Sequence, residues 1–267
     1  MIENINGISM HVRASGRTRA PVVILHHPLA TNLTIWDELT TALEGRYRVI
    51  RMDARGHGQT EAPPGAYTFD TLTADVVGLM DHLEIEKAHF LGLSMGGMIG
   101  QYLGLQYPDR FYSLCLCATT SAVPPEAVPL WDQRIRAIAD SGTTRTLVEG
   151  QLPRWVTPPV FATRPELVAR LRRMIETTPA LGYAGWCHAI RNLNLIARLR
   201  EITLPTHIIV GERDPATPPA ASEAIHREIT GSTLAIIPGV SHMLHLEDPS
   251  AFYAQVLPFL EAHGPMA

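Results

Sequence analysis

A serine with closely spaced glycines stands in the stretch Gly92-Leu93-Ser94-Met95-Gly96-Gly97. A strand-like apolar run precedes it and a helical pattern follows it, which is the context of a G-x-S-x-G nucleophile elbow. The turn must be sharp, and a Cβ two positions before or after the serine would clash, so both positions are glycine. The spacing predicts Ser94 as a nucleophile; the alternative is an ordinary strand-to-helix turn in which the serine caps the helix.

A serine hydroxyl is a weak nucleophile until a base takes its proton, and that base needs a carboxylate to orient it. His242 lies between the last predicted strand and the last predicted helix, and Asp214 follows the strand before it. Ser94, Asp214 and His242 therefore occur in the chain order of a triad built on a parallel sheet. His245 is the local rival as the base. Glu212 is interpreted as structural, and an Asp at a strand exit is also a common turn former.

The oxyanion that forms during acyl transfer needs two N–H donors. The N–H of Met95, directly after the nucleophile, is one prediction. The loop after an early strand should supply the other, and Leu29 is predicted because Pro28 has no N–H. We interpret the adjacent His26 and His27 as structural rather than metal ligands, because no carboxylate or cysteine accompanies them at ligand spacing.

Apolar runs alternate with helical patterns along the chain, which is typical of a mostly parallel sheet covered on both faces. The predicted strands are 8–14, 21–27, 47–53, 88–93, 112–118, 207–210 and 234–237. The predicted helices are 68–83, 95–106 and 251–260. The last helix follows Asp248-Pro249, where an Asp cap and an early proline favour a helix start.

The strand pattern is interrupted between residues 121 and 200, where proline, arginine and helical patterns prevail. We predict a core domain made of residues 1–120 and 201–267, with residues 121–200 as a helical cap inserted over the sheet. The cap holds eleven arginines and six acidic residues, a net charge of +5, against −9 for the remainder. Such a field attracts a small anion. The alternative is that the arginines merely solvate exposed helices.

The overall composition excludes several classes of function. With 267 residues and a net charge of −4, the chain predicts one large domain and no basic field for nucleic acid or an anionic membrane. No apolar stretch approaches 18 residues and the first twenty lack a signal-peptide pattern, so we expect no membrane span. Three cysteines make no disulfide framework, and this low, odd count indicates a reducing cytoplasm. Cys115 and Cys117 are interpreted as packing residues rather than metal ligands.

Several motifs together resemble the α/β-hydrolase superfamily. They are His27-Pro28-Leu29 with Trp36, Asp53-Ala54-Arg55-Gly56-His57-Gly58, the serine motif, Gly211-Glu212-Arg213-Asp214 and Ser241-His242. The resemblance covers nearly the whole chain. It implies a mostly parallel eight-stranded sheet flanked by helices, a helical cap, the triad and oxyanion donors named above, and no metal or organic cofactor. A serine nucleophile argues against haloalkane dehalogenases and epoxide hydrolases, which use aspartate there.

Within this superfamily the chain most resembles 3-oxoadipate enol-lactonases, which hydrolyse an anionic enol-lactone in aromatic catabolism. The similar segments are Leu29-Ala30-Thr31-Asn32, Gly58 with Glu61-Ala62-Pro63, 89–98, Trp131 with Arg134, 152–155, 182–190 and 214–219. The resemblance implies a small-molecule ester or lactone as substrate, and it makes Arg134 the best candidate to bind a carboxylate. His26-His27-Pro28 and Arg191-Asn192-Leu193-Asn194 depart from the family pattern.

Four further side chains are predicted to line the substrate pocket: Trp131, Trp155, Trp186 and Met243. Packing within the cap is the alternative for each. Two other functions stay open beside the lactonase. One is a general carboxylesterase, perhydrolase or carbon–carbon-bond hydrolase of the same fold. The other is a non-enzymatic ligand sensor, against which the complete triad and oxyanion loop argue.

Overall fold

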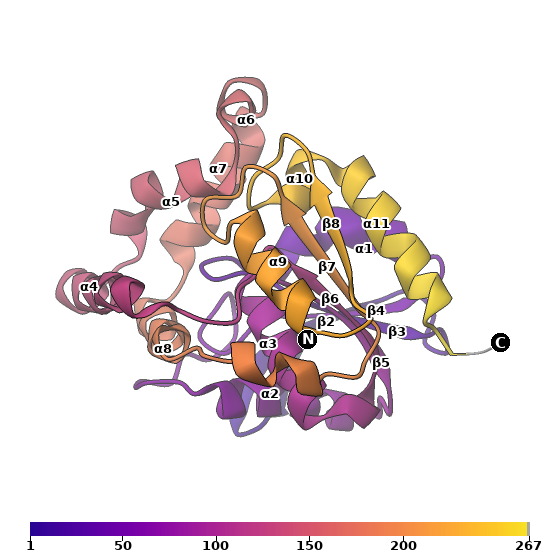
Figure 1. Cartoon of the computed structure of the whole chain (residues 1–267). Helices are drawn as coiled ribbons and strands as arrows, with labels where there is room; N and C mark the ends of the chain where they lie inside the picture. Colours follow the sequence, from indigo (N-terminus) through magenta and orange to yellow (C-terminus); the bar gives the residue numbers. More distant parts are fainter. Residues whose placement is uncertain (266–267) are drawn as a thin grey trace.

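A single eight-stranded sheet organises the molecule in the computed structural model, which describes residues 1–265 (Figure 1). Its strands are β1 (Ile2–Ile5), β2 (Ile8–Ser15), β3 (Val22–His26), β4 (Arg48–Met52), β5 (Ala88–Leu93), β6 (Phe111–Cys117), β7 (Thr206–Gly211) and β8 (Thr233–Ile237). They are ordered β1-β2-β4-β3-β5-β6-β7-β8, and only the β1–β2 and β2–β4 pairs are antiparallel. The expected mostly parallel sheet is confirmed.

Seven of the strands lie within one residue of their predicted bounds, and β1 is the addition. It forms a hairpin with β2 through Asn6 and Gly7, which both have positive φ (49° and 77°). Asn-Gly is the preferred pair for such a two-residue turn. The sequence does not reveal β1 because an edge strand with Ile2 and Asn4 toward solvent lacks an apolar run.

Helices cover both faces of the sheet. Outside the β6–β7 connection they are α1 (Asp37–Leu43), α2 (Phe69–His82), α3 (Met95–Gln106), α9 (Pro219–Glu228), α10 (Leu244–Glu247) and α11 (Pro249–Ala262). Of these, α1 packs on α11, whereas α2 packs on α3. The Asp248 side chain caps α11 by accepting the Ala251 N–H at 2.9 Å, as predicted. Helices α1, α9 and α10 are not predicted; α1 and α10 are short, and α9 begins within a proline-rich stretch.

Between β6 and β7 the chain forms five α-helices and no strand of the sheet. They are α4 (Val128–Ser141), α5 (Val148–Trp155), α6 (Pro158–Thr163), α7 (Pro165–Thr177) and α8 (Ala180–Arg191). Short 3₁₀ turns occur at Leu33–Trp36, Pro108–Arg110, Pro125–Ala127, Arg145–Leu147 and Ile196–Glu201. Figure 1 shows α4 to α8 gathered on one side of the molecule, away from α11. We call residues 121–200 the cap.

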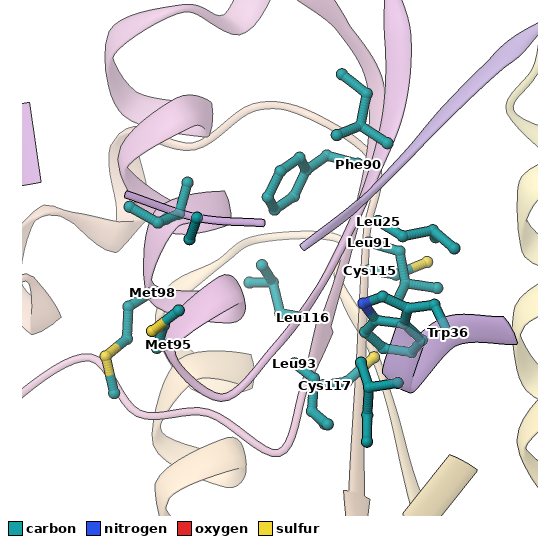
Figure 2. Close-up of a cluster of buried hydrophobic side chains, with 14 of the residues drawn as sticks. Leu25, Trp36, Phe90, Leu91, Leu93, Met95, Met98, Cys115, Leu116 and Cys117 are labelled. Atoms are coloured by element: carbon teal, nitrogen blue, oxygen red, sulfur yellow. The ribbon is translucent and has the colours of Figure 1, made fainter. Parts of the chain in front are cut away.

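The core is a continuous apolar cluster on both faces of the central strands. Cys115 and Cys117 are free and fully buried in it, and burial raises the pKa of both thiols. Figure 2 shows their sulfur atoms on the Trp36 side of β6, with Leu116 on the opposite side. Both cysteines therefore pack in the core.

Candidate active site

Ser94 lies in a strained turn at the carboxyl end of β5, with φ 56° and ψ −111°. A Cβ on Gly92 would lie 2.2 Å from the backbone of Gly96. A Cβ on Gly96 would instead lie 2.4 Å from the carbonyl oxygen of His26. The Ser94 N–H donates to the Cys117 carbonyl at 2.8 Å. These neighbours hold the unfavourable backbone conformation and leave the serine at the tip of the turn.

His242 and Asp214 form a buried hydrogen-bonded pair beyond the carboxyl ends of β8 and β7. The Nδ1–H of His242 donates to Oδ2 of Asp214 at 2.8 Å, and the two side chains are 3% and 0% exposed. Because Nδ1 is used in this way, Nε2 is the nitrogen left to exchange a proton. Ser94 and His242 line the same cavity, so the three residues predicted as a triad come together at one edge of the sheet.

Thr217 completes the environment of the carboxylate. Its hydroxyl donates to Asp214 Oδ2 at 2.8 Å, and the N–H groups of Ala216 and Thr217 donate to Oδ1 at 2.7 and 3.1 Å. Burial alone would raise the pKa of Asp214, but the charge of His242 and these hydrogen bonds together lower it below its usual value. The carboxylate is therefore ionised and held in one orientation.

His245, the local rival, lies in the core. Its Nε2–H donates to the Ile35 carbonyl at 3.2 Å, its ring packs 4.6 Å from that of Trp36, and burial lowers its pKa to about 3. It does not line the cavity. Glu212 accepts the Gly239 N–H at 2.9 Å, which is a structural contact, as expected.

Of the two predicted oxyanion donors, Met95 follows Ser94 directly in the chain and Leu29 lines the same cavity as Ser94. Met95 is the first residue of α3, so its N–H has no partner within the helix. Leu29 lines the cavity, and its N–H makes no hydrogen bond within residues 1–265. The next N–H along the loop, that of Ala30, donates instead to His57 Nε2 at 3.1 Å. Of the two neighbouring loop amides, only that of Leu29 is thus left without a partner.

Buried histidines support this loop from below; they are His26, His27 and His57. His27 Nδ1–H donates to the Pro28 carbonyl and its Nε2 accepts the Ala54 N–H, both at 2.9 Å. Burial lowers the pKa of His26 to about 4 and that of His57 to about 3. Neutral imidazoles at these positions support the loop through hydrogen bonds, which agrees with the structural interpretation of the His26-His27 pair. We call His26, His27 and His57 the histidine struts.

A cavity of about 80 Å³ lies between the cap and the sheet edge that carries Ser94, His242 and the Leu29 loop. We call this sheet edge the floor of the site. Leu29, Ser94 and His242 line the cavity from the core side. Three of the predicted substrate-binding residues line it from the cap: Trp131, Arg134 and Trp155. The Arg134 guanidinium lies 4.8 Å from the centre of the Trp131 ring, a cation–π arrangement that keeps the positive charge at the cavity wall.

Trp186 and Met243, the other two side chains predicted as substrate contacts, do not line this cavity. Trp186 is fully buried, and its Nε1–H donates to the Arg55 carbonyl at 2.8 Å. The Met243 N–H donates to the Trp155 carbonyl at 2.8 Å. Both residues instead fix the cap to the core.

Most cap arginines that form ion pairs or hydrogen bonds do so away from the cavity. Arg170 pairs with Glu38, Arg172 with Glu149, Arg191 with Asp132 and Arg198 with Glu201, while Arg164 donates to the Leu246 carbonyl. Arg191, in the stretch that departs from the lactonase pattern, thereby joins α8 to α4. The solvating or structural interpretation holds for these five.

Three further residues line the cavity beside Arg134 and are not predicted as site residues from the sequence: Gln151, Arg154 and Thr217. The signal for Thr217 is its place three residues after Asp214, within reach of an Asx-type turn. Arg154 carried a weaker signal, because its segment 152–155 resembles the lactonases but does not distinguish it from the other cap arginines.

Residues 1–265 contain no group of three or more His, Cys, Asp and Glu side chains placed to hold a metal ion. None of the helices in that range is long and apolar enough to cross a membrane.

The fold and this site define a class. A sequence profile of the alpha/beta hydrolase fold family matches residues 21–249, and the chain belongs to that family. It is therefore a hydrolase of the α/β fold.

Several known hydrolases are similar to this chain over nearly its whole length. The chain is 34% identical to 3-oxoadipate enol-lactonase 2 of Acinetobacter baylyi over 92% of this chain and 90% of that protein. The crystal structure of the enol-lactonase from Burkholderia xenovorans LB400 is 35% identical and superposes with a TM-score of 0.93 over 98% and 100% of the two chains. A thermophilic esterase from Thermogutta terrifontis, solved with malate bound, is 28% identical with a TM-score of 0.91 over 97% and 95%.

Proposed function

We propose that this protein cleaves a carboxylic ester or lactone through an acyl-enzyme, with Ser94 as nucleophile, His242 as general base and Asp214 as the residue that orients the histidine. The observation that carries the proposal is the convergence of three features on one cavity. These are the strained turn at Ser94, the 2.8 Å His242–Asp214 hydrogen bond and the N–H of Leu29, which has no hydrogen-bond partner in residues 1–265.

In the first step the Ser94 oxygen attacks the carbonyl carbon while His242 Nε2 takes the serine proton. The carbonyl oxygen becomes an oxyanion that accepts hydrogen bonds from the N–H groups of Leu29 and Met95. His242 then gives its proton to the leaving alkoxide or enolate, and the acyl group stays on Ser94. In a lactone the leaving group remains attached to that acyl chain.

In the second step water replaces the leaving group. His242 takes a proton from the water, the resulting hydroxide attacks the acyl carbon, and the Ser94 oxygen leaves with the proton returned by the histidine. Throughout, the ionised Asp214 stabilises the imidazolium form. These residues perform the whole sequence without a metal or organic cofactor.

For the substrate, we propose a small anionic lactone of the kind that 3-oxoadipate enol-lactonases hydrolyse, with residues 121–200 acting as a lid over the site. The similarity to two enol-lactonases and the presence of Arg134 at the cavity wall support this choice. A guanidinium binds a carboxylate through paired charge-assisted hydrogen bonds, which gives both affinity and orientation.

The second candidate is a general carboxylesterase. The similarity to the thermophilic esterase favours it, as does the His26-His27-Pro28 loop, which departs from the lactonase pattern beside Leu29.

The test compares hydrolysis of 3-oxoadipate enol-lactone and p-nitrophenyl acetate by the wild type and by Ser94→Ala. Efficient lactone turnover that the variant loses supports the lactonase. Ester turnover without lactone turnover, again lost in the variant, keeps the mechanism and transfers the assignment to the esterase. Turnover at an unchanged rate in Ser94→Ala rules out the mechanism.

A further inference from the structure

A second cavity, of about 310 Å³, continues outward from the catalytic one. Trp131, Arg134, Arg154 and Thr217 line both cavities, so the two meet at these side chains. We call the second one the outer cavity. Its volume lies at the lower end of the range of small-molecule sites, and the catalytic cavity is much smaller.

The walls of the outer cavity are apolar. Ala127 and Leu130 line it from the start of α4, and Pro218 and Ala221 line it from the start of α9. Leu130 is 44% exposed, which makes it one of the few large apolar side chains that the molecule leaves toward solvent. A ligand that covered it would gain the free energy of removing this surface from water.

The junction between the cavities is charged. No ion pair joins Arg134 or Arg154 to a carboxylate within the described part of the chain. Among residues 1–265, the Arg154 side chain makes one long hydrogen bond, to the Pro215 carbonyl at 3.3 Å, and its buried Nε has no partner. Burial lowers the pKa of Arg154, and the neighbouring charge of Arg134 lowers it further.

The charge of Asp214 acts on Arg154 from a distance and raises its pKa, but the Asp214 carboxylate is hydrogen-bonded to His242 and Thr217. Two adjacent guanidiniums with no carboxylate paired to either are costly unless an anion joins them. A carboxylate at the junction satisfies the open donors of both, and its two oxygens match the planar fork of a guanidinium. From that position a substrate extends inward to Ser94 and outward between α4 and α9.

We propose that the outer cavity is a second subsite, which takes an apolar chain or single ring attached to a carboxylate that Arg134 and Arg154 bind at the junction. The substrate class is then an ester or lactone whose free carboxylate also carries an apolar extension, larger than the catalytic cavity alone accommodates. This reading deepens the proposed function and rests on it for the reaction at Ser94, although binding in the outer cavity needs no turnover.

The test is calorimetric titration of straight-chain monocarboxylates, from acetate to octanoate, into the purified protein. Because a buried methylene contributes about 0.8 kcal/mol, the dissociation constant should fall about two- to fourfold for each added methylene until the cavity is full. The corresponding primary alcohols should bind much more weakly, since they lack the charge that the two arginines recognise.

Neighbouring alanines on α9 supply a matched pair of variants. Ala221 lines the outer cavity, whereas Ala220 is exposed and does not. Ala221→Phe should abolish the dependence on chain length and leave acetate binding unchanged, and Ala220→Phe should behave as the wild type. Leu130→Asp, at an exposed position that tolerates charge, should weaken octanoate binding at least tenfold without affecting acetate.

A dissociation constant independent of chain length in the wild type would overturn the subsite, and so would equal losses in the two phenylalanine variants. Ser94→Ala separates this test from that of the mechanism. It should bind the carboxylates as the wild type does while losing hydrolysis of p-nitrophenyl acetate. Retained hydrolysis would reject the catalytic role of Ser94 and leave the subsite standing.

Discussion

The floor of the site and the cap wall above it are built in different ways. On the floor, the side chains of Asp214 and His242 are buried and hydrogen-bonded to defined partners. In the cap wall, α4 buries only Ile138, and the charged groups of Arg134 and Arg154 lack carboxylate partners within the described residues. A fixed floor suits a reaction with one geometry, whereas a wall with open donors suits the selection of a substrate.

Within the cap, helices α8 and α4 differ in how closely they pack on the core. Helix α8 packs on the core backbone to backbone, since a Cβ on Gly182 would lie 1.9 Å from the Gly56 carbonyl oxygen. The Tyr67 N–H also donates to the Gly185 carbonyl at 3.1 Å. Helix α4 contacts the rest of the protein mainly through α8. Within the described residues, the anchored helix α8 contributes only Ile190 to the lining of the cavity, whereas α4 contributes Trp131 and Arg134.

The largest effect is expected on the floor, from Asp214→Asn. This change keeps the shape of the side chain but removes the charge that stabilises the imidazolium, so kcat should fall about 10⁴-fold. Steady-state kinetics with p-nitrophenyl acetate measures it, with the free energy of unfolding as a control for folding. A loss below tenfold would mean that the buried pair is structural only.

The histidine struts predict how the floor responds to acid. His26 and His57, with folded pKa values of about 4 and about 3, and His27, whose pKa is also lowered by burial, all titrate near 6.5 once unfolded. The unfolded state therefore binds more protons below pH 6.5. The stability that depends on neutral imidazoles is complete above that pH and is lost as the pH falls toward the folded values.

Each of these groups contributes up to about 1.4 kcal/mol per pH unit in that window. Urea unfolding at intervals between pH 7.5 and 5 measures the slope. A free energy of unfolding that stays constant or rises toward pH 5 would contradict the neutral struts.

In the cap wall, Arg134→Gln and Arg154→Gln should each raise KM for an anionic ester about ten- to a hundredfold, the size expected for one charge-assisted hydrogen-bonding partner. KM for a neutral ester with the same leaving group should change little, and so should kcat. Equal changes for both esters would reject the arginines as a carboxylate site. Arg172→Gln, at a cap arginine paired with Glu149, serves as the control.

The smallest expected effect is on the free energy of unfolding, and it distinguishes α8, which is anchored to the core, from the rest of the cap. Gly182→Ala forces α8 away from Gly56 and should lower the free energy of unfolding by about 1–3 kcal/mol. Gly150→Ala, inside α5 with no atom near the added Cβ, should raise it by about 0.5–1 kcal/mol. Equal changes in the two variants, measured by urea unfolding, would show that α8 has no special contact with the core.

The parts of the fold and of the site that the sequence predicts are those that depend on local patterns. The elbow glycines, the strand ends and the order Ser94, Asp214, His242 depend on short-range geometry, so the positions that meet at the sheet edge follow from the sequence. Whether Trp186 or Trp155 faces the cavity depends instead on how α8 and α5 dock on the core, and both residues are large, apolar and fully buried. No local pattern separates them.

The same reasoning applies to the charges of the cap. An excess of arginine is visible in the sequence, but pairing decides which arginines remain open. Arg191 is matched by Asp132 from another helix, and Arg154 has no such partner among the described residues. Contacts between distant residues create this difference, so only the folded chain reveals it.

The most direct test of the central claim is covalent. The protein is treated with diethyl p-nitrophenyl phosphate, which phosphorylates an activated serine, and the modified residue is mapped by mass spectrometry. We predict one diethylphosphoryl group per chain, on Ser94, with loss of esterase activity in proportion, and with the same labelling in Arg134→Gln because the floor is unchanged. Absence of the label, or a label that persists in Ser94→Ala, would contradict the account.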